Sequence, residues 1–252
     1  MQLGLHFVRR GTRPVTSGVR SVSSGLRSTQ LGLRWATACW RALLAALAVA
    51  ASAVSVAADV EVAVRDLNAQ PLMDAVVFAE PVDVATTPPG HATAHALIDQ
   101  VNKEFVPLVT IVRVGTEVSF PNSDNIRHSI YSFSAAKPFT TKLYSGKQAP
   151  PVIFDKAGVV VLGCNIHDMM AAWVVVVDTP YFAKTSASGT AALKGLAPGD
   201  YHVSVWYPGP TVAPAISDLH VGAEGDAHLE FKVDGAASSL PALRARAAQT
   251  KP

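Results

Sequence analysis

The chain has 252 residues with 21 Lys and Arg against 19 Asp and Glu, a formal net charge of +2. Seven arginines, and no Lys, Asp or Glu, lie in residues 1–58, so the remainder has 14 basic against 19 acidic residues, a net charge of −5. The slight basicity belongs to the first 58 residues, and the composition therefore argues against a nucleic-acid-binding protein. The length allows one or two domains.

Residues 1–58 are predicted to be a signal peptide. Behind the arginine-containing start, residues 42–56 form an apolar run of the length expected for a signal-peptide core, and small residues predict cleavage after Ala58. A membrane anchor is the alternative, but the run is shorter than the ~20 apolar residues that a span requires. We therefore expect a periplasmic protein with no stable membrane span once the leader is removed. Cys39 leaves with the leader, so Cys164 becomes the only thiol and no intramolecular disulfide forms.

The first residues after the leader predict two strands, at 60–64 and 75–78, joined by a turn. Residues 81–96 are expected to form a loop because they are rich in Pro and Gly. His91 and His95 lie in this loop four residues apart, a spacing that on a helix would suit a metal pair. The Pro/Gly context and the absence of an accompanying Asp, Glu or Cys favour an ordinary loop instead.

A strong β pattern begins near residue 105, and no segment after the leader shows a convincing amphipathic helix, so the predicted fold class is all-β. The apolar run at 173–177 predicts a strand covered on both faces, too short to span a membrane. Beyond Asp178 short strands alternate with Gly- and Pro-containing turns, and residues 234–252 are predicted to be a disordered tail. Further strands are expected at residues 109–114, 117–120, 129–133, 152–154, 159–162, 191–193, 201–206 and 227–233.

One short loop carries three kinds of metal ligand. Cys164 ends a β-branched run, and His167, Met169 and Met170 follow within six residues. A thiolate, an imidazole and a thioether at this spacing indicate copper, which for electron transfer is held by two histidines and a cysteine with a weak axial thioether. His128 is the expected second histidine, because it lies in a turn-rich segment between two strand patterns.

Two motifs frame these residues, Val114-x3-Val118-x-Phe120-x-Asn122-x-Asp124-x3-His128-x-Ile130 and Gly158-x5-Cys164-x2-His167-x2-Met170. They resemble the cupredoxins, the blue-copper family, and the short ligand loop is most similar to the amicyanin branch. The resemblance implies a Greek-key β-sandwich over residues 98–178, with Met170 as the axial ligand and Met169 packing or lying at the surface. The chain departs from the family at Ala172, where a glycine is common, and at residues 159–162, which lack the usual aromatic alternation.

The whole chain is also similar to exported cupredoxin-domain proteins named for methylamine utilisation, a name that proves no substrate. Residues 183–203, with Gly189, Pro198 and Gly199, resemble the carboxypeptidase regulatory-like β-sandwich, a structural module without peptidase activity. The first half of that module resembles residues 62–81. This resemblance implies a regulatory-like sandwich at 59–97 and 179–233 that is interrupted by the cupredoxin segment. A plain tandem order is the alternative.

Neighbouring side chains are expected to steady the ligand loops. Ser129 and Asn165 each follow a ligand and are expected to tie the two loops together, and Asp168 either tunes the basicity of His167 or is an ordinary solvated carboxylate. Trp173 and Phe120 are expected in the core, because both lie in strand patterns.

The predicted function is a periplasmic mononuclear type 1 copper protein that carries one electron between redox partners such as a cytochrome or dehydrogenase. No acid–base pair or nucleophile indicates an enzyme. A dinuclear copper site is disfavoured because it requires a second bridging cysteine. The alternatives are a copper delivery or storage protein that uses the same ligands, and a non-redox exported β-sandwich binding module.

Overall fold

The computed structural model describes residues 57–83, 94–146, 149–209, 214–222, 227–235, 238, 240, 242 and 243. The predicted leader with Cys39, and His91 in the predicted loop, lie outside these residues. Within them, no helix has the length and apolar character needed to cross a membrane. Almost all regular structure there is β, which confirms the all-β prediction.

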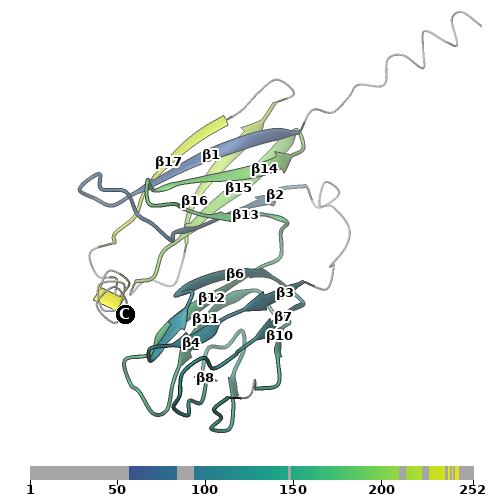
Figure 1. Ribbon diagram of the computed structural model, residues 1–252. Coiled ribbons are helices and arrows are strands. Elements are labelled where there is room, and N and C mark those ends of the chain that lie inside the picture. The colour runs from purple at the N-terminus through teal and green to yellow at the C-terminus, as the bar shows by residue number, and fades with distance from the viewer. Residues whose placement is uncertain are drawn as a thin grey trace, which may run out of the picture. The chain divides into compact units, whose positions relative to one another are not determined.

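Residues from both ends of the described chain form the first pair of sheets (Figure 1). One sheet has the order β14-β1-β17, and the other has the order β13-β2-β15-β16. Alternate residues such as Val62 on β1 and Val203 on β15 are fully buried in one shared core. The bounds are β1 Ala58–Arg65, β2 Val76–Pro81, β13 Tyr181–Lys184, β14 Thr190–Leu196, β15 Gly199–Trp206, β16 Ala215–Val221 and β17 Ala227–Lys232.

The intervening residues form sheets of their own, with orders β10-β7-β3, β6-β12-β11-β8-β9 and β4-β5. Their core contains Phe105, Phe120, Phe154 and Leu162, and it also includes Cys164. The bounds are β3 His95–Leu97, β4 Asp99–Val101, β5 Glu104–Val106, β6 Val109–Arg113, β7 Thr116–Ser119, β8 Tyr131–Ser132, β9 Phe139–Thr140, β10 Val152–Phe154, β11 Gly158–Gly163 and β12 Ala171–Val177.

The sequence of strand β12 is apolar throughout because each face of the strand contacts a different core. Trp173 and Val175 belong to the first core, whereas Val174 and Val176 belong to the second. Successive side chains of a strand point to opposite faces, so a strand with two buried faces is apolar throughout. The prediction that this run is covered on both faces is confirmed.

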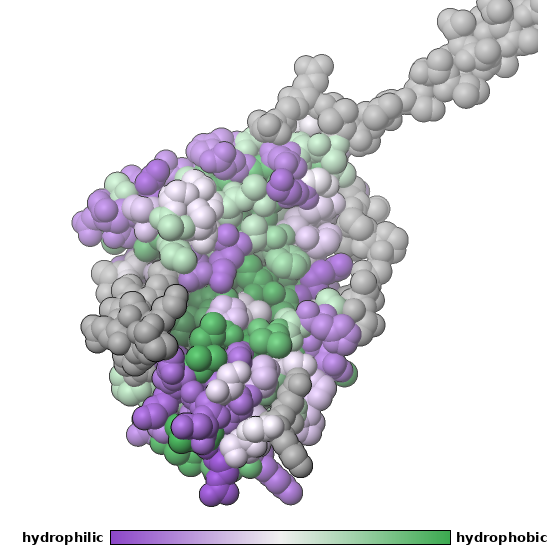
Figure 2. All heavy atoms as spheres, viewed as in Figure 1, coloured by the Kyte–Doolittle hydropathy of each residue, from purple (hydrophilic) through white to green (hydrophobic). Residues whose placement is uncertain are grey.

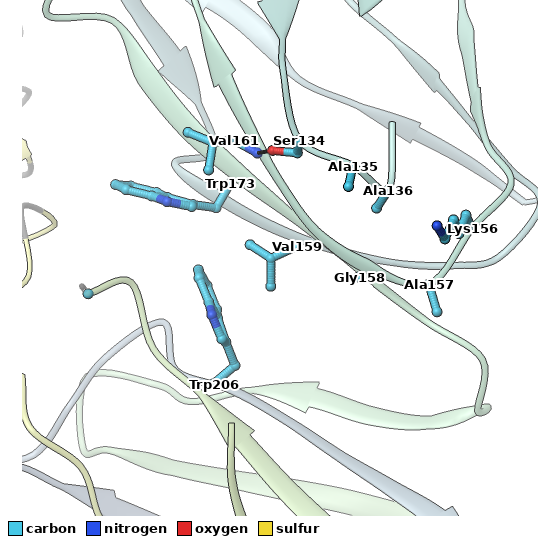
Figure 3. Close-up of a pocket in the computed structure, with 11 residues that line it drawn as sticks. Ser134, Ala135, Ala136, Lys156, Ala157, Gly158, Val159, Val161, Trp173 and Trp206 are labelled. Atoms are coloured by element: carbon cyan, nitrogen blue, oxygen red, sulfur yellow. Dashed lines mark hydrogen bonds between the residues drawn. The ribbon is translucent and has the colours of Figure 1, made fainter. Parts of the chain in front are cut away.

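The two cores are joined by both apolar and polar contacts. Hydrophobic residues gather across the middle of the face in Figure 2, at the level of β13 and β6. Lys184 on β13 lies 2.8 Å from Asp74 and donates a hydrogen bond of 2.9 Å to the carbonyl of Val109 on β6. Beside β11, Trp173 and Trp206 line a cavity of about 440 Å³ (Figure 3).

Several elements differ from the sequence expectations. The two strands predicted at 60–64 and 75–78 are present as β1 and β2, and they lie in different sheets. β16 was not predicted, although polar and apolar residues alternate along it. The short strands β3, β4, β5, β9 and β13 were not predicted either. In the expected disordered tail, Leu240 and Leu243 are buried in the first core. The apolar residues of this polar, Ala-rich segment show no clear period, so the sequence did not indicate that they pack against a core.

The division into an interrupted regulatory-like module stays a prediction. β1 pairs with β14 and β17, and β2 pairs with β13 and β15.

Candidate metal centre

His128 lies in the segment between β7 and β8 and is completely buried. Its backbone N–H donates to the carbonyl of Tyr144 at 3.0 Å, and its own carbonyl accepts from the Tyr144 N–H at 2.9 Å. The side-chain amide of Asn122 donates to the carbonyls of Ile126 and Tyr144, at 2.9 and 3.0 Å. Asn122 thus fastens the turn before His128 to the strand-like segment that pairs with it, which fixes the histidine backbone.

Asp124 holds the side chain of His128. Its carboxylate accepts the backbone N–H groups of Asn102 at 2.6 Å and Lys103 at 2.9 Å, and lies 2.7 Å from Nε2 of His128. Burial raises the pKa of Asp124, but the hydrogen bonds from Lys103, His128 and Asn102 outweigh it and leave the pKa below the ordinary value. Asp124 is therefore ionised at neutral pH.

An ionised carboxylate only accepts hydrogen bonds, so Nε2 of His128 must carry the proton. In the neutral imidazole this leaves the lone pair on Nδ1, which lies 3.7 Å from Sγ of Cys164. A metal-binding histidine commonly donates its other ring N–H to a carboxylate, because this fixes the tautomer and raises ligand basicity. The Asp124–His128 pair has this arrangement.

Cys164 and Met170 bracket the short loop between β11 and β12, and both side chains are buried. The loop is closed by a hydrogen bond of 2.9 Å from the N–H of Met170 to the carbonyl of His167. Gly163 precedes the cysteine, and a Cβ there would come within 2.5 Å of the Tyr131 ring. A side chain at this position would displace the Tyr131 ring, so glycine lets β8 pack closely over the start of the loop.

His167 is half-buried, with Nδ1 turned inward. That atom is buried and has no hydrogen bond partner among the described residues. Burial and the nearby charges of His128 and Lys103 lower the pKa of His167, more than Asp124 and Asp168 raise it. The neutral imidazole, the form that binds metals, is therefore favoured. The rings of His128 and His167 have centroids 5.0 Å apart and an interplanar angle of 58°.

The structure brings three of the four predicted ligands together. One ring nitrogen each of His128 and His167 and the sulfur of Cys164 lie within 4.8 Å of one another, and they are the only such group of three or more found in the described part of the chain. A buried imidazole nitrogen without a partner is costly unless something binds it. Two imidazoles and one thiolate are the donor set that copper takes in electron-transfer sites, so these residues fit copper.

The two methionines of the loop have different environments. Met170 is 2% exposed and belongs to the same apolar core as Cys164, whereas Met169 is 64% exposed. This difference supports Met170 as the axial ligand, an assignment that stays a prediction.

The expected neighbours of the ligands turn out differently. Ser129 is buried, but its hydroxyl has no hydrogen bond partner among the described residues, and Asn165 is exposed, so the predicted tie between Ser129 and Asn165 is wrong. Asp168 is exposed and acts on His167 only through its charge.

Phe120 and Trp173 are buried in the cores, as predicted. His95 pairs with Glu117 at 3.3 Å on β3, away from the ligands.

Sequence reasoning missed the roles of Asp124 and Tyr144. The role of Asp124 could have been recognised from the local sequence, because this residue precedes His128 by four residues in a turn. Tyr144 had none, because its backbone bridge to His128 joins residues 16 positions apart. Its hydroxyl donates to the carbonyl of Phe120 at 3.0 Å and contacts Gln100, and burial is the main cause that raises its pKa to about 12.

Comparison with known proteins gives similarity at the level of solved structures only. No protein-family model matches this chain, and no curated protein matches it significantly. A Cu-containing nitrite reductase from Thermus scotoductus SA-01 is similar at 26% identity and a TM-score of 0.32, over 39% of this chain and 25% of that one. A purple cupredoxin from Nitrosopumilus maritimus is similar at 24% identity and a TM-score of 0.30, over 32% of this chain and 99% of that one. A proline-to-glycine mutant of amicyanin in its reduced Cu(I) form is similar at 20% identity and a TM-score of 0.31, over 40% of this chain and 98% of that one.

Proposed function

We propose that the protein is a mononuclear type 1 copper protein that carries single electrons. The observation that carries this proposal is the group formed by His128, Cys164 and His167, whose donor atoms lie within 4.8 Å of one another. These residues would form the trigonal plane, and Met170 would be the axial ligand. Bound copper would supply the one-electron couple between Cu(I) and Cu(II).

The protein's contribution to electron transfer is to keep the ligands in one geometry. The backbone of His128 is held by its bridge to Tyr144 and its ring by Asp124, and Cys164 is buried at the end of β11. Ligands that do not rearrange between oxidation states keep the reorganisation cost of electron transfer low. His167 is the ligand nearest to solvent, so we infer that electrons pass through its edge.

The cellular setting is part of the same proposal. We place the protein in the periplasm after cleavage near Ala58, with a cytochrome or dehydrogenase as electron donor or acceptor. Only the sequence resemblance supports the assignment to the methylamine utilisation type and the assignment of the regulatory-like module. We propose a carrier because two imidazoles and one thiolate are the donor set of electron-transfer copper sites.

A visible absorption spectrum of the copper-loaded protein tests this function. We expect an intense blue band from the copper–thiolate bond and a reversible potential, and Cys164→Ser should abolish the band while the fold persists, because a hydroxyl lacks the thiolate's covalency. A band that survives in Cys164→Ser would disprove the assignment. Copper held as Cu(I) without reversible oxidation would indicate delivery or storage instead, and failure to bind one equivalent would favour a non-redox binding module.

A further inference from the structure

Two histidine–aspartate pairs lie side by side on the β15–β16 ladder, far along the chain from the copper ligands. Nδ1 of His202 lies 2.6 Å from the carboxylate of Asp218, and Nδ1 of His220 lies 2.7 Å from that of Asp200. The strand register places His202 opposite Asp218 and Asp200 opposite His220. The pairs therefore occupy alternate rungs of the ladder, and their four side chains share one face of the sheet.

Both imidazoles use the same ring nitrogen for the carboxylate. A carboxylate accepts hydrogen bonds, so in the neutral imidazole each Nδ1 is the donor and each Nε2 keeps its lone pair. No hydrogen bond or ion pair involves Nε2 of either histidine in the described part of the chain. This carboxylate–imidazole orientation is the one that metal-binding histidines adopt, with the carboxylate raising the basicity of the free nitrogen.

The position of the two histidines allows them to share one ion. His202 and His220 are diagonal neighbours across the antiparallel pair, a separation within reach of long side chains. The same four side chains line a surface hollow of about 390 Å³, together with Val82, Tyr201 and Leu219. Glu80 on β2 is opposite His202 in the register and is exposed, so a further carboxylate lies on the same face of the sheet beside the hollow. The surplus of negative charge favours a cation in the hollow.

The supporting strands are held firmly. β15 pairs with β2 on one side and with β16 on the other along most of its length. Its opposite face, with Tyr201 and Val203, is buried in the first core. Two ligands on adjacent paired strands therefore keep a fixed spacing, which lowers the entropic cost of binding an ion.

We propose that Nε2 of His202 and Nε2 of His220 bind a divalent transition-metal ion of the class that prefers imidazole, such as Zn²⁺, with Asp200 and Asp218 orienting the rings. Water completes the coordination, so the site is open and exchangeable, unlike the buried three-donor group at Cys164. The site is independent of the electron-carrier function.

The test is a calorimetric titration of the copper-loaded full chain with Zn²⁺, while the visible band reports on the first site. We expect one equivalent of Zn²⁺ to bind with the band unchanged. The double variant His202→Ala/His220→Ala should lose this equivalent, and Asp200→Asn/Asp218→Asn should weaken it about tenfold, as loss of an orienting carboxylate typically does. His228→Ala removes an exposed histidine on β17 and should change nothing.

The outcomes separate this site from the copper site. Mg²⁺, which prefers oxygen ligands, should not compete for the two imidazoles. If the chain took up no copper, the same titration of His167→Ala/Cys164→Ser, which lacks two of the three donors of the first site, would still count the Zn²⁺ bound at the ladder. Absence of the equivalent, or its survival in the double histidine variant, would show that the two pairs are cross-strand ion pairs only and would overturn the proposal.

Discussion

The two histidines at the proposed copper site are supported in opposite ways. His128 is fully buried, bridged by backbone hydrogen bonds to Tyr144 and held at Nε2 by a carboxylate. His167 lies in the short loop between β11 and β12, where the side chains on either side of it are exposed, namely Asn165, Ile166, Asp168 and Met169. One side of the site is therefore a hydrogen-bonded scaffold and the other is a surface loop. We infer that the scaffold sets the geometry of the ligands, whereas the loop provides contact with solvent and partners.

The largest expected difference between the two sides is in stability without copper. His128→Ala removes a buried ring and leaves Asp124 without one of its three donors, so we expect the free energy of unfolding to fall by about 2–4 kcal/mol. His167→Ala changes a half-exposed side chain and should cost less than about 1 kcal/mol. Both variants should lose the blue band. Urea unfolding of the copper-free proteins measures the two costs, and equal costs would refute the comparison.

A second prediction concerns the carboxylates on each side. Asp124→Asn replaces an acceptor of three N–H groups by an amide whose NH2 faces donors, so we expect a loss of about 1–3 kcal/mol of stability. Asp168→Asn beside His167 is the matched control, and because this side chain is exposed its effect should stay within about 0.5 kcal/mol. The spectrum of copper-loaded Asp124→Asn should also shift, because the orientation of His128 loosens. An unchanged stability and spectrum would show that Asp124 does not hold His128.

The same asymmetry explains how much of the site the sequence could predict. Cys164, His167 and Met170 lie within one segment of the chain, so their chemistry can be recognised together. The strands were predictable where burial alternates, as on β15, or is continuous, as on β12. The support of His128 was not predictable, because it depends on contacts between segments that only the tertiary structure brings together.

Asp124 shows this dependence most clearly. Its two backbone donors come from Asn102 and Lys103, more than 20 residues earlier, and both have left-handed backbone conformations, with φ of 55° and 63°. The two residues form the two-residue loop of the β4–β5 hairpin, where such conformations are common, but nothing in the local sequence indicates that their N–H groups meet Asp124. The prediction for Ser129 and Asn165 was wrong for the same reason, since sequence adjacency to a ligand does not determine where a side chain points.

The smallest expected effect distinguishes the two methionines at the end of the loop. Met170 is buried with Cys164, so Met170→Leu should leave copper bound but raise the potential, because it removes a weak donor that favours Cu(II). Met169 is 64% exposed, and Met169→Leu should leave the potential unchanged. Each exchange nearly conserves volume and should cost less than about 1.5 kcal/mol of stability, so a change in potential would reflect the ligand and not the packing. Voltammetry of both variants under the same conditions makes the comparison. A potential that moved with Met169→Leu and not with Met170→Leu would reverse the assignment of the axial ligand.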